Sequence, residues 1–342
     1  MRTVLRHTTT TPFTSGCRLA TGRSAILHTV ERFKPDIVLM PCYVPDGVIR
    51  PVQHAGVEIV FYRLDQWMRP DEADITRRLA KKPGRAMLIV IHYFGWRQPT
   101  EHLSLVVRAR GGILFEDCAH CLPGPAGVGQ DGDVVLYSLN KFLPVADGAI
   151  LASRNPALDL SITEHLVPLP RNVIGAYQAH LEANGRIAAA DHKREADAIG
   201  RAHDDSKSAY EVYYDHINSD MSPREQSAQS RAIEAMTDFA MMSARRACFA
   251  HILDRCLLRD RVWREDARFA YPIRCNGKRR EIDTALYREG FMAATLTERW
   301  DHVQPQFAIE TDFYDDHLLL PMGESVTADD TITMAKVLEG FA

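Results

Sequence analysis

The sequence has no long apolar run, because none of its hydrophobic stretches approaches the ~18 residues of a membrane-spanning helix. It also lacks an excess of positive charge, since 41 Lys and Arg residues against 45 Asp and Glu residues give a net charge of −4. We therefore expect neither a membrane nor a nucleic acid as partner. Residues 1–11 have no apolar core, so no secretory signal is expected there.

Cysteine is scarce and odd in number. The seven cysteines are scattered along the chain, which favours a reducing, cytoplasmic environment over a disulfide framework. Cys118 and Cys121 have the spacing of a zinc or redox pair, but no second pair follows at a suitable distance, so we predict no metal site. Lysine is scarce as well, with only eight residues in 342.

The first part of the chain predicts an α/β sheet. Short, mostly apolar segments alternate with helical stretches, and continuous apolar strands are typical of parallel sheets buried on both faces. The expected strands are 36–41, 58–63, 86–92, 112–117, 133–138 and 148–153. Helices are expected at 24–33, 71–80 and 101–110, on both faces of a mostly parallel sheet.

The pattern changes after Arg154. No strand is expected from 172 to 258, where charged helices with exposed faces are indicated, and 191–216 is expected to be a solvated face or part of a subunit contact. Ser222, Pro223 and Glu225 together resemble a helix start capped by Ser222. Later elements are expected at 268–275 (strand), 283–289 (helix), 317–320 (strand) and 328–341 (helix).

The length of 342 residues favours one large and one smaller domain. We predict a large domain at 1–240, with a helical insert at about 172–222, and a smaller C-terminal α/β domain at 241–342.

Two expected strands end in polar residues that suit one cofactor. Asp117 ends the strand 112–117, and Lys141 follows the strand 133–138. In open α/β sheets, ligands bind outside the carboxyl ends of the strands. A lysine amine forms a Schiff base with pyridoxal 5′-phosphate (PLP), and a carboxylate keeps its pyridine nitrogen protonated. Each residue alone also fits a structural role, as a helix cap or a solvated loop lysine, but the pair favours PLP.

Lys141 differs from the other lysines, because it follows a buried strand directly and precedes the apolar segment 142–145. Partial desolvation there would lower its pKa and assist Schiff-base exchange.

A turn at Gly22, Arg23 and Ser24 leads into a helix. Backbone N–H groups at a helix start, together with a guanidinium and a hydroxyl group, suit a phosphate. An ordinary N-cap at Ser24 is the alternative interpretation of this turn. Ser138, just before the lysine, is a second candidate for contact with a phosphate.

The ordered set of motifs resembles the DegT/StrS-type family of PLP-dependent sugar aminotransferases, which have fold type I. The matching segments are GRSA at 22–25, PCY at 41–43, EDCAH at 116–120, SLNKF at 138–142, ARRA at 244–247 and HLLLPM at 317–322. The resemblance runs from Gly22 to the C-terminus, with 172–222 poorly matched.

The resemblance implies a role for each site residue. Lys141 would carry the Schiff base, Asp117 would pair with the pyridine nitrogen, and His120 would lie near the phenolic oxygen or the ring face. Tyr43 would stack on the ring, with core packing as the alternative. The phosphate would be held by Gly22, Arg23, Ser24 and Ser138.

Four features depart from the family pattern. Gly22 and Arg23 replace the usual Gly-Thr turn, the spacing from Ser138 to Lys141 is short, and Gly148 is followed by alanine instead of a second glycine. Val44 and Pro45 stand where the family's usual aromatic residue follows Pro41. These departures leave the substrate and the reaction open.

We expect a PLP-dependent aminotransferase that takes an amino donor and a small-molecule acceptor. The acceptor would be a keto sugar, a cyclitol or another small keto or aldehyde intermediate of a biosynthetic pathway. The alternatives are PLP-dependent elimination, decarboxylation or carbon–carbon bond formation on an amino-acid-like substrate, and a non-catalytic PLP-binding protein. The resemblance also implies a homodimer whose partner subunit completes each site.

Two further segments are candidates for lining a substrate pocket, with ordinary packing as the alternative. They are residues 92–97 and the group formed by Arg299, Trp300 and His302.

Overall fold

The computed structural model describes residues 16–341 except 124–127, 191, 193–194 and 295–305. A seven-stranded sheet in the order β1-β7-β6-β5-β4-β2-β3 forms its centre. Its strands are β1 (Cys17–Leu19), β2 (Ile37–Pro41), β3 (Glu58–Tyr62), β4 (Ala86–Ile91), β5 (Ile113–Asp117), β6 (Val134–Ser138) and β7 (Ala149–Ser153). Strands β2 to β6 are parallel, β7 is antiparallel to β6, and β1 is antiparallel to β7. The predicted mostly parallel sheet is confirmed, with β1 as an unpredicted addition.

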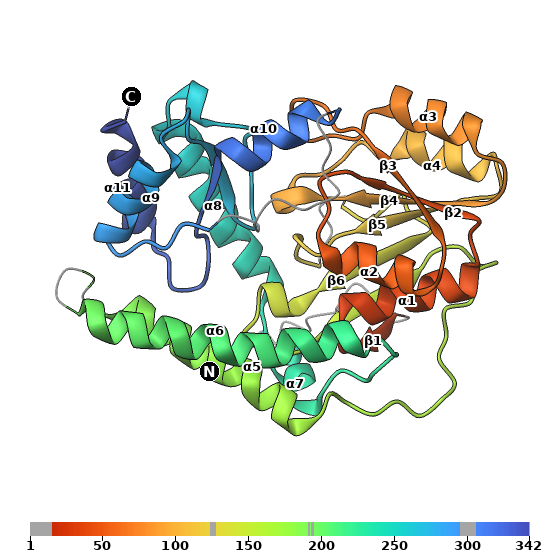
Figure 1. The fold of residues 1–342 in the computed structure, drawn as a ribbon, viewed down its shortest axis with the longest axis horizontal. Helices are drawn as coiled ribbons and strands as arrows, with labels where there is room; N and C mark the ends of the chain where they lie inside the picture. Colours follow the sequence, from red (N-terminus) through yellow and green to blue (C-terminus); the bar gives the residue numbers. More distant parts are fainter. Residues whose placement is uncertain (1–15, 124–127, 191, 193–194, 295–305, 342) are drawn as a thin grey trace, which may run out of the picture.

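Helices cover both faces of this sheet. Helices α1 (Gly22–Phe33) and α2 (Asp46–His54) lie on one face, and α3 (Glu72–Lys81) and α4 (Glu101–Arg108) lie on the other (Figure 1). Every residue of β2, β4, β5 and β6 is buried, as expected for strands covered on both sides. Three of the four helices match the predicted stretches, whereas α2 was not predicted, because Gly47 and Pro51 obscure its helical pattern.

The register of the sheet brings distant residues to one edge. Ile91 pairs with Asp117, and Ser138 pairs with Ala149, so the carboxyl ends of β4, β5 and β6 lie together. Strand β1 runs against β7 and places Leu19 opposite the same Ala149. Its end therefore lies at this edge, and α1 begins beside the ends of β5 and β6.

Four helices occupy most of the region from 171 to 256, where helices were predicted. Helices α5 (Arg171–Ala189) and α6 (Ala196–Ser219) form a long hairpin, followed by α7 (Ala228–Met236) and α8 (Phe239–Cys256) (Figure 1).

The predicted helix start at Ser222 was wrong. Asp220 accepts hydrogen bonds from the backbone and hydroxyl of Ser222. The backbone N–H of Glu225 donates to Val167, so this segment is held in an extended conformation and α7 begins later, with Ser227 as its cap.

The C-terminal part contains a second, two-stranded antiparallel sheet, formed by β8 (Tyr271–Arg274) and β9 (His317–Leu320). Helices α9 (Arg279–Arg288), α10 (Ala308–Asp316) and α11 (Ala328–Glu339) accompany it. The predicted strands and two of these helices are confirmed, and Thr327 caps α11 through a capping box with Asp330. The predicted pocket residues Arg299, Trp300 and His302 lie outside the described residues. None of the helices in the described part of the chain is both long and apolar enough to cross a membrane.

Candidate active site

The edge where the strand ends meet borders a cavity of ≈ 520 Å3. All but one of the residues predicted to hold the cofactor line this cavity: Gly22, Arg23, Tyr43, Asp117, His120, Ser138 and Lys141. They come from the start of α1, from the segment after β2, and from the ends of β5 and β6. The register of the sheet therefore explains why residues more than a hundred positions apart in the sequence share one cavity.

Ser24 is the exception. Helix α1 begins at Gly22 and is capped by Thr21, whose hydroxyl accepts from the backbone N–H of Ser24. The hydroxyl of Ser24 lies 2.6 Å from that of Thr21, and both side chains are buried. The alternative that Ser24 is the N-cap was wrong, and among the described residues Thr21 lines the cavity where Ser24 was expected.

Lys141 lies in a short 3₁₀ turn, Leu139–Lys141, that directly follows β6. Its side chain is accessible through the cavity, yet its Nζ atom lies deep in the protein, and this desolvation lowers the pKa of the amine. Asp117 acts in the opposite direction, and the positive charge of Arg23 lowers the pKa further. The predicted desolvation of Lys141 is confirmed. Among the described lysines, it is the one that lines this cavity.

His120 holds the amine of Lys141. The backbone N–H of Phe94 donates to His120 Nδ1 at 3.2 Å, so the proton of the neutral imidazole is on Nε2. Nε2 lies 3.1 Å from Lys141 Nζ, and a lysine accepts a hydrogen bond only as the free amine. Burial lowers the pKa of His120 well below its usual range, and the charge of Lys141 lowers it further. The geometry therefore places a neutral histidine beside the amine of Lys141, which accepts this hydrogen bond whenever it is in its free-amine form.

Two neighbours fix the ring of His120. Phe94 has a left-handed backbone (φ 53°), which is unusual for a residue with a side chain and aims its N–H at the imidazole. Phe269 stacks on the imidazole with ring centroids 4.3 Å apart and an interplanar angle of 6°. The backbone N–H of Phe269 in turn donates to the carbonyl of Phe94, so both contacts reinforce each other.

Asp117 is buried at the end of β5, and burial raises the pKa of its carboxyl group, although Lys141 and the backbone N–H of Ala119 act against this rise. One carboxylate oxygen accepts from Ala119 at 2.9 Å. The other has no hydrogen bond to any residue in the described part of the chain. A buried carboxylate with one free oxygen at a cavity favours a ligand that brings a positively charged donor.

Arg23 is positioned by the hairpin. Its Nε donates to Asn218 Oδ1 at 2.9 Å, and its guanidinium lies 5.2 Å from the ring centroid of Tyr214. Gly47 leaves room for it, because a Cβ atom there would lie 3.2 Å from Arg23 Cζ. No carboxylate within the described ranges pairs with Arg23. The N–H groups of Gly22 and Arg23, in the first turn of α1, lack intrahelical acceptors, so this corner of the cavity suits an anion.

Ser138 and Tyr43 also border the cavity, but each has a second role. The hydroxyl of Ser138 donates to Asn140 Oδ1 at 2.8 Å, which shapes the turn that carries Lys141. Tyr43 is fully buried, and its ring packs within 5.5 Å of the rings of Tyr93, Phe313 and Tyr314. Its predicted stacking on a cofactor ring stays a prediction.

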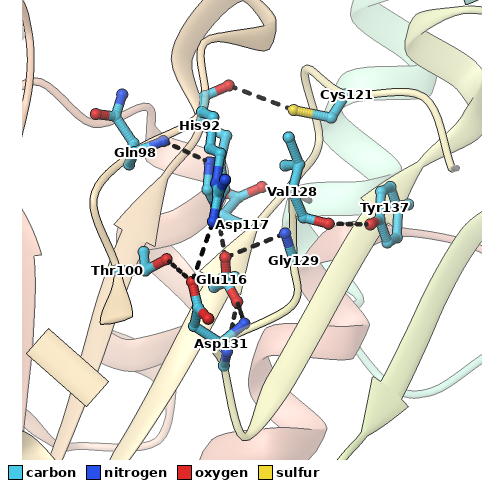
Figure 2. Close-up of polar contacts among 12 residues, drawn as sticks. His92, Gln98, Thr100, Glu116, Asp117, Cys121, Val128, Gly129, Asp131 and Tyr137 are labelled. Atoms are coloured by element: carbon cyan, nitrogen blue, oxygen red, sulfur yellow. Dashed lines mark hydrogen bonds and ion pairs between the residues drawn. The ribbon is translucent and has the colours of Figure 1, made fainter. Parts of the chain in front are cut away.

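Glu116 was quoted in the motif, yet its role is structural. Figure 2 shows its carboxylate between His92 and the loop that carries Gly129 and Asp131. Glu116 is not among the residues that line the cavity. Its Oε2 lies 2.8 Å from His92 Nε2, and both side chains are fully buried. It also accepts from the backbone N–H groups of Gly129, Asp131 and Gly132. Burial would raise the pKa of Glu116, but these hydrogen bonds and the charge of His92 hold it below the usual range.

The segment 92–97 contains both residues that line a cavity and residues that pack in the interior, the two roles considered for it. His92 is a buried structural partner, Tyr93 lines the cavity of Lys141, and Trp96 and Arg97 line a second cavity.

The hairpin contributes a wall that the sequence interpretation missed. Tyr210, Tyr213, Tyr214 and Ile217 of α6 line the cavity together with Tyr177 of α5. The stretch was interpreted as a solvated face or a subunit contact. Their spacing of three, four and seven residues places them on one face of a helix, and this was the available signal.

The described residues contain no group of three or more His, Cys, Asp and Glu side chains that could hold a metal ion. All seven cysteines lie in the described part of the chain, and none of them forms a disulfide.

No protein-family model matches the chain, and no curated protein sequence matches it. Several solved structures, however, are similar to it. The aminotransferase TlmJ of Streptoalloteichus hindustanus is 17% identical, with a TM-score of 0.65 over 95% of this chain and 85% of that chain. The putative sugar aminotransferase Spr1654 of Streptococcus pneumoniae in its PMP form is 14% identical, with a TM-score of 0.66 over 95% and 87%.

A DegT/DnrJ/EryC1/StrS aminotransferase of Brucella abortus is 15% identical, with a TM-score of 0.59 over 95% of this chain and 85% of that chain. At these identities the likeness concerns the fold. The resemblance indicated by the motifs is confirmed at that level: the chain has the fold of the DegT/DnrJ/EryC1/StrS-type aminotransferases.

Proposed function

We propose that the protein is a PLP-dependent aminotransferase that binds its cofactor through Lys141. The observation that carries the proposal is the grouping of three side chains in one cavity. They are a lysine with a lowered pKa, a buried carboxylate with a free oxygen, and an arginine without a carboxylate partner. The similar solved structures support it, because all three are named as aminotransferases.

The residues present fit the cofactor. Lys141 would carry it, Asp117 would hold the pyridine nitrogen, and Arg23 with the N–H groups of the first turn of α1 would hold the phosphate. When bound, PLP supplies an electron-accepting ring that stabilises negative charge at the substrate carbon.

The chain's own groups supply the remaining chemistry. In its free-amine form, Lys141 would bond to a carbonyl carbon with loss of water, and would afterwards take a proton from one carbon and return it to another. His120 orients this amine through Nε2. The tyrosines of α5 and α6 form one side of the cavity beside this amine.

The acceptor that we propose is a keto sugar, a cyclitol or another small keto or aldehyde compound. The decisive experiment is to add each common amino acid separately to the purified protein with PLP and to follow the cofactor spectrum. We expect one amino donor, without any acceptor, to bleach the visible band of the bound cofactor. Persistent bands with all donors, or product formation by elimination or decarboxylation, would contradict transamination.

Arg23 is expected to recognise the phosphate specifically. Arg23→Gln should weaken PLP binding by about ten- to a hundredfold, because a charge-assisted hydrogen bond contributes roughly 1.5–3 kcal/mol. Binding of pyridoxal, which lacks the phosphate, should change little. Both are measured by absorbance titration.

The matched control is Arg32→Gln on the outer part of the same helix, where Arg32 pairs with Asp159 at the surface. It should bind both compounds like the unaltered protein. Equal weakening of PLP and pyridoxal by Arg23→Gln would show that Arg23 supports the fold instead of the phosphate.

We also propose a homodimer, on the strength of the resemblance to fold-type-I enzymes and because Arg23 is the one arginine that lines the cavity among the described residues. A second subunit would supply further donors for a dianionic phosphate. Light scattering at micromolar concentration checks it, and a fully active particle with the 38.5 kDa mass of one chain would exclude it.

A further inference from the structure

A second cavity, of ≈ 210 Å3, lies beside the first, and His120 lines both. It is smaller than the ~300–1,000 Å3 of typical sites for drug-sized ligands. The segment after β4, the segment after β5 and residues 264–268 contribute to it, together with Arg246 of α8. Trp96, Leu122 and Phe142 provide apolar surface in its lining.

Arg246 is a buried cation in this lining, with 4% of its surface exposed. Its Nη1 donates to the carbonyls of Arg268 and Phe269 at 3.2 and 2.9 Å. Its Nε is buried and has no hydrogen-bond partner, and no carboxylate of the described residues forms an ion pair with it. Desolvation lowers its pKa to about 10, with the distant Glu324 acting against the shift and Arg245 adding to it.

Arg264, on another part of the lining, is a second arginine with a buried N–H group that has no acceptor. Its Nη2 donates to the carbonyl of Arg97 at 2.7 Å, and its guanidinium lies 5.4 Å from the ring centroid of Trp96. Its Nη1 is buried without a partner. Desolvation lowers its pKa to about 10, assisted by Arg69 and opposed by Asp65 and Asp266. The described residues offer it no ion pair either.

The carboxylates at this cavity are engaged elsewhere. Asp266 binds Arg268 at 2.8 Å, and Glu265 binds the exposed Arg259. Two arginines therefore keep uncompensated charge, and each has one buried N–H group without an acceptor. Burying an unpaired charge and an unsatisfied donor is unfavourable unless a ligand compensates for them.

We infer that this second cavity binds a carboxylate group of a small organic acid or amino acid. Two guanidinium groups that line one cavity without a carboxylate partner supply the positive charge and the hydrogen-bond donors that a carboxylate needs. The apolar residues of the lining accommodate the carbon skeleton that carries it. This apolar surface favours a carboxylate on a carbon skeleton over inorganic phosphate.

The same contacts link the second cavity to Lys141. The guanidinium of Arg246 lies 5.0 Å from the ring centroid of Phe142, the residue that follows Lys141. The guanidinium of Arg246 also donates a hydrogen bond to the carbonyl of Phe269, whose ring stacks on His120. We therefore assign the bound carboxylate to a substrate that reacts at Lys141. This assignment rests on the proposed function, whereas the binding itself does not.

Calorimetric titration of the cofactor-free protein with succinate, at constant ionic strength, tests the binding. We expect succinate to bind more tightly than inorganic phosphate, and Arg264→Gln to weaken it by at least about tenfold. This variant avoids Arg246, whose bonds to two carbonyls also support the fold. Arg245→Gln is the matched control, because Arg245 lies outside the cavity and bonds to the 324–326 segment. It should bind succinate like the unaltered protein.

No succinate binding at millimolar concentration, equal binding by Arg264→Gln, or tighter binding of phosphate would overturn the inference. Lys141→Ala should bind succinate unchanged, so this result stands even if PLP does not attach to the protein. In the PLP-loaded protein, succinate should compete with the amino donor for the spectral change. Binding without competition would overturn the assignment to a substrate.

Discussion

Lys141→Ala will lose covalent attachment of PLP, and its turnover will fall by at least about 10²–10⁴-fold, the usual contribution of a positioned proton-transfer group. The larger part of that range is expected, because the same amine also forms the bond to the cofactor. In the unaltered protein, borohydride reduction should fix the cofactor to the peptide that contains Lys141, as read by mass spectrometry. The prediction rests on the lowered pKa of this amine and its contact with His120.

The control is Lys81→Ala, at an exposed lysine near the end of α3. It should keep the covalent cofactor and the full rate. A reduced adduct on any lysine other than Lys141 would refute the assignment, and so would an unaltered cofactor band in Lys141→Ala.

Asp117→Asn should retain PLP but lose turnover by about a hundredfold or more, because one preorganised ionic contact is worth roughly 3 kcal/mol or more in the transition state. An amide cannot keep the pyridine nitrogen protonated, so the ring accepts electrons poorly. The asparagine oxygen still accepts the hydrogen bond that Asp117 takes from Ala119. The local turn should therefore survive, and the measured quantities are the cofactor spectrum and kcat.

The melting temperature of Asp117→Asn separates a catalytic role of Asp117 from a structural one. Burial raises the pKa of Asp117 in the folded protein, so the contribution of this carboxyl group to stability is present at acidic pH and is lost as the pH rises through that raised pKa. Near neutral pH the neutral asparagine should leave the melting temperature of the cofactor-free protein unchanged or higher. A lower melting temperature with a normal rate would identify Asp117 as a structural cap.

The periodicity of the sequence was sufficient for the sheet. Strands β2 and β4 are continuous apolar runs, β5 and β6 begin as apolar runs and end in polar residues, and all four are buried in the structure. It failed where the signal is weak or ambiguous. Strand β1 is only three residues long, and the Ser222 segment carries the composition of a helix start but is held extended by contacts to Val167 and Asp220.

Only the family resemblance distinguished the roles of the neighbouring carboxylates Glu116 and Asp117; the residues alone did not. Successive residues of a strand point to opposite faces, so one carboxylate faces the cavity and the other is enclosed by His92 and the 129–132 loop.

The sequence by itself determined the α/β class, the strands β2 to β7 with the helices α1, α3 and α4 between them, and the pair formed by Asp117 and Lys141 at the ends of β5 and β6. These follow from local periodicity and from the rule that parallel strands share one carboxyl edge. Only the tertiary structure decided that Arg23 meets Asn218, that α6 presents its tyrosines to the cavity, and that Arg246 and Arg264 share a second one. Such contacts join segments distant in sequence, and their geometry arises only when the packed elements fix both side chains.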